Sequence, residues 1–311
     1  MSDPPGALLT IDEPDDGSRL DVVLVRRVHG MSRARARRLI QQGQVLLNGR
    51  AASKGDRLSA GDEVRLSELP TPTDFDPLAD DGALAVAYED AHLVIVDKPA
   101  GIPTHPLRPD ETATLANRLL ARYPEMRGVG YQRREPGILH RLDNDTSGLL
   151  IAARTAEAFD ALLALLKDGA IDKGYQALVD GSLAPRRIDH PIAKHPSDPR
   201  RVHVCVDGLD RRIVASRPAV TEIERTSLIG ERTLAFASAE RAVRHQVRAH
   251  LASIGHPLVG DWLYGGTLID GLGRHFLHAY RIAFVHPFGG AQVDVEVPLP
   301  VELAALVEDA R

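Results

Sequence analysis

Apolar runs of strand length recur along most of this chain and outnumber the segments with helical spacing. Two such runs occur in residues 83–106, where a turn at Glu89-Asp90 separates them. Helical spacing is found at 112–123 and 156–167. Further strands are predicted at 149–153, 175–179, 202–206, 213–216, 219–225, 233–239, 277–285 and 291–297. Because the strands follow one another in adjacent groups, the pattern predicts an α+β domain with a mixed, mainly antiparallel sheet and flanking helices.

A shorter pattern precedes this domain. Residues 18–67 begin with two short amphipathic segments, the second at 33–42, which predict two helices. A strand with an Asn48-Gly49 turn follows, and another strand is expected at 63–66. Two helices and a small sheet therefore form a separate N-terminal domain. No G-x-G-x-x-G follows a strand and no P-loop occurs in the chain, which excludes the usual nucleotide-cofactor folds.

Charge is distributed unevenly among the segments. The chain has a formal net charge of −5, which argues against a polyanionic partner, because Lys and Arg contacts to phosphate dominate nucleic-acid affinity. Residues 18–67, however, contain eleven Lys and Arg against four Asp and Glu. Residues 1–17 carry five acids and no base, and are predicted to be a disordered acidic leader. A proline- and aspartate-rich linker is predicted at 68–83, before a large domain at 84–311.

Composition restricts the class of protein. Hydrophobic residues make up 43% of the chain and charged residues 26%, which excludes a disordered or fibrous protein. Cys205 is the single cysteine, so no intramolecular disulfide can form, and the first residues lack a secretion signal. No apolar run approaches the ~20 residues needed to cross a bilayer. We expect a cytoplasmic monomer with no membrane partner.

One segment, GILHRLDNDTSGLLIAART at 137–155, places polar chemistry directly before a strand. The polar cluster from His140 to Gly148 precedes an apolar run that is expected to be buried. Asn, Asp, Ser and Gly form turns readily, but a turn alone does not require a histidine and an arginine beside Asp143. A carboxylate close to an arginine stays ionised even when it is partly desolvated. Asp143 is therefore a candidate nucleophile or base.

The sequence at this point resembles a known family. The cluster HRLDNDTSG, preceded by DKPAGIPTHP, is similar to the RluA-type pseudouridine synthases. Three later motifs occur in the order of that family: KGYQALVDG, HQVRAHLASIGHPLVGDWLYGG and LHAYRIAFVHP. Residues 18–67 resemble the α-L RNA-binding module first known from ribosomal protein S-four. The resemblance implies an enzyme that detaches uracil from its ribose within RNA and rejoins it through carbon-5, with no cofactor.

The resemblance also implies roles for particular residues. Asp143 matches the catalytic aspartate, Arg141 the residue that helps to displace the target base, and Tyr175 the residue that packs on that base. Arg248, on a helix predicted at 243–254, would pair with Asp143. Further contacts to RNA are expected from His140, Lys98, Arg33, Arg35, Arg37 and Arg38.

Some features leave alternatives open. Lys98 could equally be a lysine that only ends a strand. Leu142 and Ile151 are candidates for the dry wall of a pocket that must exclude water, because water would turn an isomerase into a hydrolase. Ala242 and Val243 stand where the family usually has Gly-Arg, which affects local substrate contacts more than chemistry.

Other kinds of site fit the sequence less well. His245 and His250 lie roughly 140° apart around a helix, and no second pair has the spacing of a zinc site, so no metal is expected. Asp143 and Asp145 are two residues apart in a turn, which does not fix the carboxylate separation of a glycoside hydrolase. The loop at 255–266 is interpreted as structural.

Two functions from different classes remain. The first is an RNA isomerase, in which the carboxylate acts either as a nucleophile or as a base. The second is a non-catalytic RNA-binding protein that keeps the fold. In the family that the chain resembles, the linked basic module accompanies a preference for ribosomal large-subunit RNA. The resemblance therefore implies this RNA as the partner, and transfer RNA is the alternative.

Overall fold

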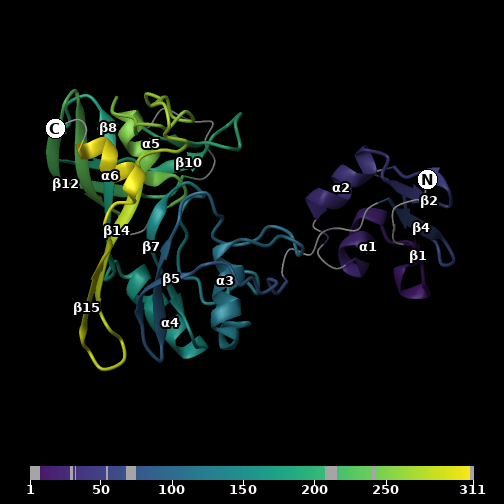
Figure 1. Cartoon of the computed structure of the whole chain (residues 1–311). Helices are drawn as coiled ribbons and strands as arrows, with labels where there is room; N and C mark the ends of the chain where they lie inside the picture. The colour runs from purple at the N-terminus through teal and green to yellow at the C-terminus, as the bar shows by residue number, and fades with distance from the viewer. Residues whose placement is uncertain are drawn as a thin grey trace. The chain divides into compact units, whose positions relative to one another are not determined.

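The chain forms two compact units, Met1–Phe75 with Leu107–Pro109, and Asp76–Pro106 with Asp110–Arg311 (Figure 1). The structure is a computed structural model. It describes residues 8–28, 31, 33–53, 55–67, 75–206, 216–239 and 243–308, with residues 34 and 35 described by their backbone alone.

The N-terminal unit packs two helices against a small antiparallel sheet with the strand order β1-β4-β2-β3. Its elements are β1 (Leu8–Thr10), η1 (Glu13–Asp15), α1 (Leu20–Arg27), α2 (Arg33–Gln41), β2 (Val45–Leu47), β3 (Arg50–Ala51) and β4 (Glu63–Leu66). Asn48 and Gly49 have positive φ values of 50° and 79°, as a tight turn between β2 and β3 requires. The two helices and the Asn-Gly turn occur where the sequence predicts them.

The acidic leader differs from the prediction. Residues 8–16 belong to the folded unit, because β1 pairs with β4 and Ile11 is 2% exposed. Asp15 is also buried and forms ion pairs with Arg26 and Arg27 at the end of α1. The acidic and basic segments that look separate in the sequence therefore neutralise each other here. Residues 1–7 lie outside the described part of the chain.

The second unit is built on a mixed sheet of nine strands in the order β5-β6-β7-β14-β8-β13-β12-β9, with β15 paired to β14. Among the described strands only β7 and β14 pair in parallel, which confirms the predicted α+β class with a mainly antiparallel sheet. The strands are β5 (Ala85–Glu89), β6 (Leu93–Lys98), β7 (Ser147–Ala153), β8 (Asp172–Asp180), β9 (Arg186–Asp189), β12 (Val220–Ile229), β13 (Arg232–Ser238), β14 (Leu277–Val285) and β15 (Gln292–Glu296), and a separate hairpin joins β10 (Ile192–Lys194) to β11 (Val202–Val204).

Helices cover both faces of this sheet (Figure 1). They are α3 (Leu115–Arg122), η2 (Pro124–Met126), α4 (Ala156–Lys167), α5 (Gln246–Ser253) and α6 (Val301–Glu308). Side chains alternate between the faces along each strand. Tyr175 and Ala177 of β8 therefore join the core beneath α3 and α5, whereas Leu178 joins the core beneath α6. The α4 helix packs on the second face, over β6 and β7.

Some predicted boundaries are wrong. The helix expected at 243–254 begins at Gln246, because His245 has a left-handed backbone with φ 56°. The strand expected at 213–216 falls mostly outside the described residues. The strands β9 and β10, which have four and three residues, are too short to show a clear period and were not predicted, and neither was the helix α6.

The predicted linker at 68–83 is also shorter than expected. Residues 76–83 belong to the second unit: Asp76 pairs with Arg133, and Asn117 Nδ2 donates a hydrogen bond of 2.6 Å to the carbonyl of Leu78. The ion pair explains Asp76 as a partner of the folded domain. Residues 68–74 lie outside the described part of the chain.

Gly148 allows the parallel contact between β7 and β14. Its φ is +114°, and a Cβ atom at this position would lie 2.2 Å from the carbonyl oxygen of Ala279. No other residue type fits so close an approach of two backbones. The glycine therefore sets the position of the polar loop that precedes β7 relative to the segment that precedes β14.

We expect Gly148→Ala to lower the free energy of unfolding by more than about 2 kcal/mol, because a strained backbone alone costs about 1–3 kcal/mol and the clash with Ala279 adds to it. Denaturant unfolding checks this value. The matched control is Gly289→Ala, which has φ +96° but no atom within 4 Å of the added Cβ. Equal losses in the two variants would contradict the steric argument.

Candidate active site

Three side chains from one segment hold the polar loop before β7. Thr146 Oγ1 lies 2.8 Å from His275 Nε2, and Ser147 Oγ lies 2.9 Å from His278 Nδ1. Arg274 Nη1 donates a hydrogen bond of 3.0 Å to the carbonyl of Asp145. The loop is therefore anchored at Asp145 and at the two residues that follow it, by residues about 130 positions later in the chain, at the start of β14.

Asp143 projects from this loop and receives one arm of a buried guanidinium. Arg248 Nη1 donates a hydrogen bond of 2.8 Å to Asp143 Oδ2. Arg248 also donates from Nε and Nη2 to the two oxygens of Asp261, at 2.7 and 2.9 Å. The side chain of Asp143 is 18% exposed and that of Asp261 is 1% exposed. One arginine thus connects two carboxylates, of which only Asp143 reaches the surface.

The surroundings keep the Asp143 carboxyl ionised. Burial alone would raise its pKa, but the electrostatic interactions with His245 and Arg248 hold the pKa below its usual value. His245 Nε2 is 3.8 Å from Asp143 Oδ1, and burial lowers the pKa of His245 to about 4. His245 is therefore neutral at pH 7, and Arg248 supplies the lasting positive charge.

Tyr175 shares a small depression with Asp143. The depression has a volume of about 40 Å³ and is also lined by Arg141, Val243 and Arg248. Tyr175 is 4% exposed, and burial followed by the charge of Asp143 raises the pKa of its hydroxyl well above the usual value. The tyrosine therefore stays protonated at neutral pH and acts as a flat, neutral surface with a hydrogen-bond donor.

His140 and Arg141 occupy different environments. His140 Nε2 accepts a hydrogen bond of 3.2 Å from the backbone N–H of Ile151, and burial lowers its pKa to about 3, so the ring is neutral. Arg141 is exposed and lies at the boundary between the small depression and a larger pocket of about 500 Å³. The larger pocket does not contain Asp143, so pocket size by itself does not identify the site.

The structure contradicts the predicted RNA contact of Lys98. Its side chain is 0% exposed, and Nζ donates hydrogen bonds of 2.9–3.0 Å to the carbonyls of Pro99, Ile102 and Asn144. A buried ammonium with three carbonyl partners has no donor left for a phosphate. Lys98 therefore ties the end of β6 to the loop that carries Asp143.

One of the two residues predicted to form the dry wall lies elsewhere. Leu142 lines the depression and packs in the same core as Tyr175. Ile151 belongs to the core on the opposite face of the sheet, because alternate residues of β7 point to opposite sides. Leu277 of β14 lines the depression in its place.

The basic helix α2 belongs to the N-terminal unit. Arg33, Arg37 and Arg38 are exposed there, and Arg37 Nε lies 3.4 Å from Asp21 Oδ2. The side chain of Arg35 lies outside the described part of the chain, as does Ala242.

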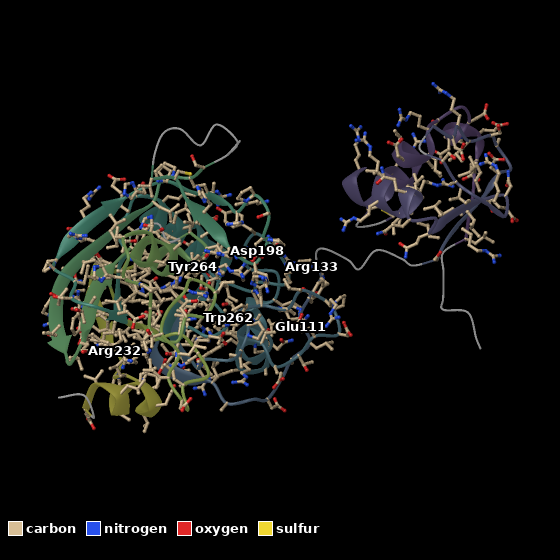
Figure 2. The ribbon with its side chains drawn as sticks, turned by 90° about the horizontal axis from the view of Figure 1, so that it is seen from above. Glu111, Arg133, Asp198, Arg232, Trp262 and Tyr264 are labelled. Atoms are coloured by element: carbon tan, nitrogen blue, oxygen red, sulfur yellow. The ribbon has the colours of Figure 1, made fainter. Side chains whose placement is uncertain are left out.

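Sequence reasoning missed Asp261. It stands in the loop at 255–266, which was interpreted as structural, and a buried aspartate in that loop has meaning only once its partner is known. The same loop carries Trp262 and Tyr264, which are labelled in Figure 2. The hydroxyl of Tyr264 lies 3.0 Å from His245 Nδ1. No sequence pattern predicted the left-handed backbone conformation of His245 either.

The residues that the structure describes contain no group of three or more His, Cys, Asp or Glu side chains placed to hold a metal ion. No helix among them is long and apolar enough to cross a membrane.

Similar proteins define the class of this one. A family model described as RNA pseudouridylate synthase matches residues 92–253, and a model of the S4 domain matches residues 18–64. A ribosomal large subunit pseudouridine synthase D of Nitrosomonas europaea is 36% identical over 312 residues, which cover 97% of this chain and 87% of that protein. An uncharacterised RNA pseudouridine synthase of Bacillus subtilis is 33% identical and covers 97% of both chains.

A solved structure, human RNA pseudouridylate synthase domain containing 1, matches with a TM-score of 0.56 and 24% identity over 73% of this chain and 89% of that one, which supports the fold alone. Fold and sequence together define an RNA-modifying isomerase. The chain belongs to the RluA-type RNA pseudouridine synthases and carries an S4 domain at its N-terminus.

The buried histidines make the protein sensitive to acid. Burial lowers the pKa of His140 and His275 to about 3, and that of His105, His245 and His278 to about 4. Below pH 6.5 the unfolded chain binds protons that the folded chain excludes. As the pH is lowered, each histidine then decreases the free energy of unfolding by up to about 1.4 kcal/mol per pH unit. The decrease ends when the pH reaches the pKa of that histidine in the folded protein.

We therefore expect the free energy of unfolding to fall steeply as the pH is lowered from 6.5 to about 4. Urea unfolding at each pH measures the slope. In His278→Gln, the slope of the unfolding free energy against pH should be smaller by up to the contribution of one bound proton. This difference in slope does not depend on how the variant changes stability at pH 7. Identical slopes in the variant and the wild type would contradict this account.

Proposed function

We propose that this protein converts uridine to pseudouridine in ribosomal large-subunit RNA, with Asp143 as the group that acts on the ribose. The observation that carries the proposal is the hydrogen-bonded pair of Asp143 and Arg248 at the edge of a buried site that also contains Tyr175. The names of the relatives from Nitrosomonas europaea and Zymomonas mobilis, both ribosomal large subunit pseudouridine synthase D, favour this RNA.

The reaction needs an ionised carboxylate. When the bond between ribose C1′ and uracil N1 breaks, its electron pair leaves with the base and positive charge develops on the sugar. The Asp143 carboxylate either attacks C1′ or removes a ribose proton, and both routes require the anion. The base then turns and C5 bonds to C1′, while the bond between Asp143 and C1′ breaks or Asp143 returns the ribose proton. C5 then loses its proton, and N1, which kept the electron pair of the broken bond, takes up a proton. His245 and Arg248 keep Asp143 charged although it is largely buried.

The freed base must stay in place between these steps. Tyr175 offers a flat face for packing on uracil, and Leu142 and Leu277 provide apolar walls. Because the depression is small, the target nucleotide has to leave its stack, which costs a few kcal/mol. Arg141 is exposed at the rim, where a guanidinium can fill the vacated stack or hold a phosphate.

The S4 domain supplies a second contact to RNA. The exposed side chains of Arg33 and Arg38 on α2 are suited to phosphate contacts, which raise affinity without reading sequence. We propose that this unit binds a structured part of the same RNA while the second unit acts on the uridine.

Asp143→Asn is expected to abolish pseudouridine formation, because the amide is nearly the same size but can neither attack C1′ nor accept a proton. Purified protein and transcribed large-subunit RNA, without metal or nucleotide, are incubated and pseudouridines are mapped. RNA affinity of the variant should stay within about threefold of the wild type, because the phosphate contacts are unchanged. Product formation by the variant at the wild-type rate would contradict the role of Asp143. Product from transfer RNA alone would show that transfer RNA is the substrate in place of ribosomal RNA.

Arg33→Gln with Arg38→Gln is expected to weaken RNA binding and to reduce the slope of log affinity against log salt by about one to two, since each lost phosphate contact releases roughly one counterion fewer. Filter binding over a series of salt concentrations measures the slope. The control pair, Arg187→Gln with Arg225→Gln, removes the same charge from exposed positions of the second unit. Equal slopes for the two pairs would show that α2 makes no special contact.

A further inference from the structure

The larger pocket lies directly beside the proposed active site and has no role in the reaction described so far. Its volume is about 500 Å³, and it shares Arg141 and Val243 with the depression that contains Asp143. A molecule that enters both spaces would therefore place one of its parts in each, with Arg141 between them. An RNA chain with its target uridine at Asp143 is such a molecule.

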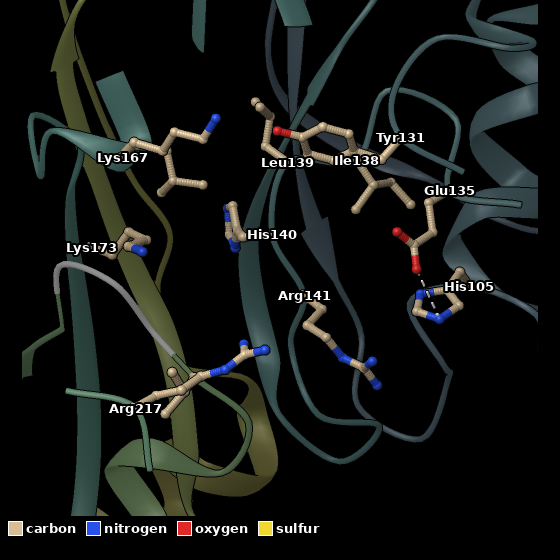
Figure 3. A pocket seen from close by; sticks show the side chains of 12 residues that line it. His105, Tyr131, Glu135, Ile138, Leu139, His140, Arg141, Lys167, Lys173 and Arg217 are labelled. Atoms are coloured by element: carbon tan, nitrogen blue, oxygen red, sulfur yellow. Dashed lines mark ion pairs between the residues drawn. The ribbon is translucent and has the colours of Figure 1, made fainter. Parts of the chain in front are cut away.

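Positive charge is concentrated around this pocket. Four basic side chains line it, and in Figure 3 Lys167, Lys173 and Arg217 lie around His140. They come from separate segments: Lys167 ends α4, Lys173 is on β8, and Arg217 precedes β12. The fourth is Arg141, and the lining includes one carboxylate, Glu135, which faces His105 at 3.2 Å. This arrangement attracts an anion such as phosphate.

Apolar and aromatic groups complete the pocket. Ile138, Leu139 and Leu166 form part of its lining. Tyr131 also lines it and is 68% exposed, with its ring held edge-to-face against Phe159 at a centroid distance of 5.3 Å. An exposed aromatic ring next to basic side chains is the combination with which proteins bind unpaired nucleotides, since the ring stacks on a base and the cations contact its phosphate.

We propose that this pocket binds the nucleotide that neighbours the target uridine. Its base stacks on Tyr131 and contacts the apolar lining, and its phosphate is held by Arg217 and Lys167. The inference rests on the proposed function, because it takes the position of the target from Asp143. The volume is in the range of sites for ligands of this size. A uridine drawn out of its stack also loosens its neighbour, which then needs a binding site of its own.

The first test separates this pocket from a general attraction to RNA. Tyr131→Ala and Arg217→Gln should each lower kcat/KM about tenfold on the RNA that the wild type modifies, mainly through KM. Tyr131→Phe keeps the ring and should stay close to the wild type. Arg225→Gln is the matched control: this arginine is exposed and lies 3.8 Å from the ring centre of Phe236, on the face opposite Tyr175. Equal losses for Arg217→Gln and Arg225→Gln would overturn the proposal.

The second test identifies the bound nucleotide. In a short RNA that contains the modified uridine, the base on its 5′ side or on its 3′ side is replaced by an abasic residue. One of these replacements should lower kcat/KM of the wild type about tenfold. The same replacement should lower kcat/KM of Tyr131→Ala only slightly further, because the ring on which the base stacks is already absent. Full, independent losses at both positions in Tyr131→Ala would overturn the proposal.

A binding measurement separates failure of this inference from failure of the proposed function. In the Asp143→Asn background, which tests binding without turnover, adding Tyr131→Ala should weaken RNA affinity about tenfold. Unchanged affinity together with normal wild-type turnover would overturn the pocket assignment alone. Product formation by Asp143→Asn would instead contradict the proposed function, while a Tyr131-dependent affinity would still support the pocket.

Discussion

The candidate site depends on one guanidinium that is shared between two carboxylates. Arg248 uses Nε and Nη2 for the buried Asp261, and this bidentate contact fixes the plane of the guanidinium. Nη1 is then directed to Asp143, which alone of the two carboxylates is accessible. Burying an arginine without partners would be costly, so Asp261 makes the buried charge possible and Asp143 completes it. A reactive anion can thus persist at neutral pH in a nearly dry site.

This arrangement requires two distant segments to meet where two neighbouring central strands of the sheet begin. The loop before β7 carries Asp143. Arg274 and His275, which precede β14, and His278 on β14 hold that loop. The two strands pair in parallel over only two residue pairs, and the backbone of Gly148 touches that of Ala279. A short contact of this kind is precise because no side chain separates the two backbones. The close contact between the two backbones therefore fixes the position of the loop that carries Asp143.

The two pockets relate this geometry to RNA. The smaller one contains Asp143 and Tyr175, whereas the larger one has the charge and the exposed aromatic ring typical of sites for unpaired nucleotides. Arg141 belongs to both. An enzyme that selects one uridine among many in a large RNA needs contacts beyond the target base, because uracil itself is the same at every site.

Much of this protein could be predicted from its sequence. Local patterns determine the α+β class, the N-terminal domain and the loop that carries Asp143, because strand alternation, turn residues and a polar cluster before an apolar run are properties of neighbouring residues. Tertiary structure alone decided which residues meet. It buried Lys98 under three carbonyls, moved Ile151 to the other face, folded part of the acidic leader onto α1 and joined Asp261 to Arg248. The physical reason is that desolvation and partner choice depend on distances in space, which no local pattern contains.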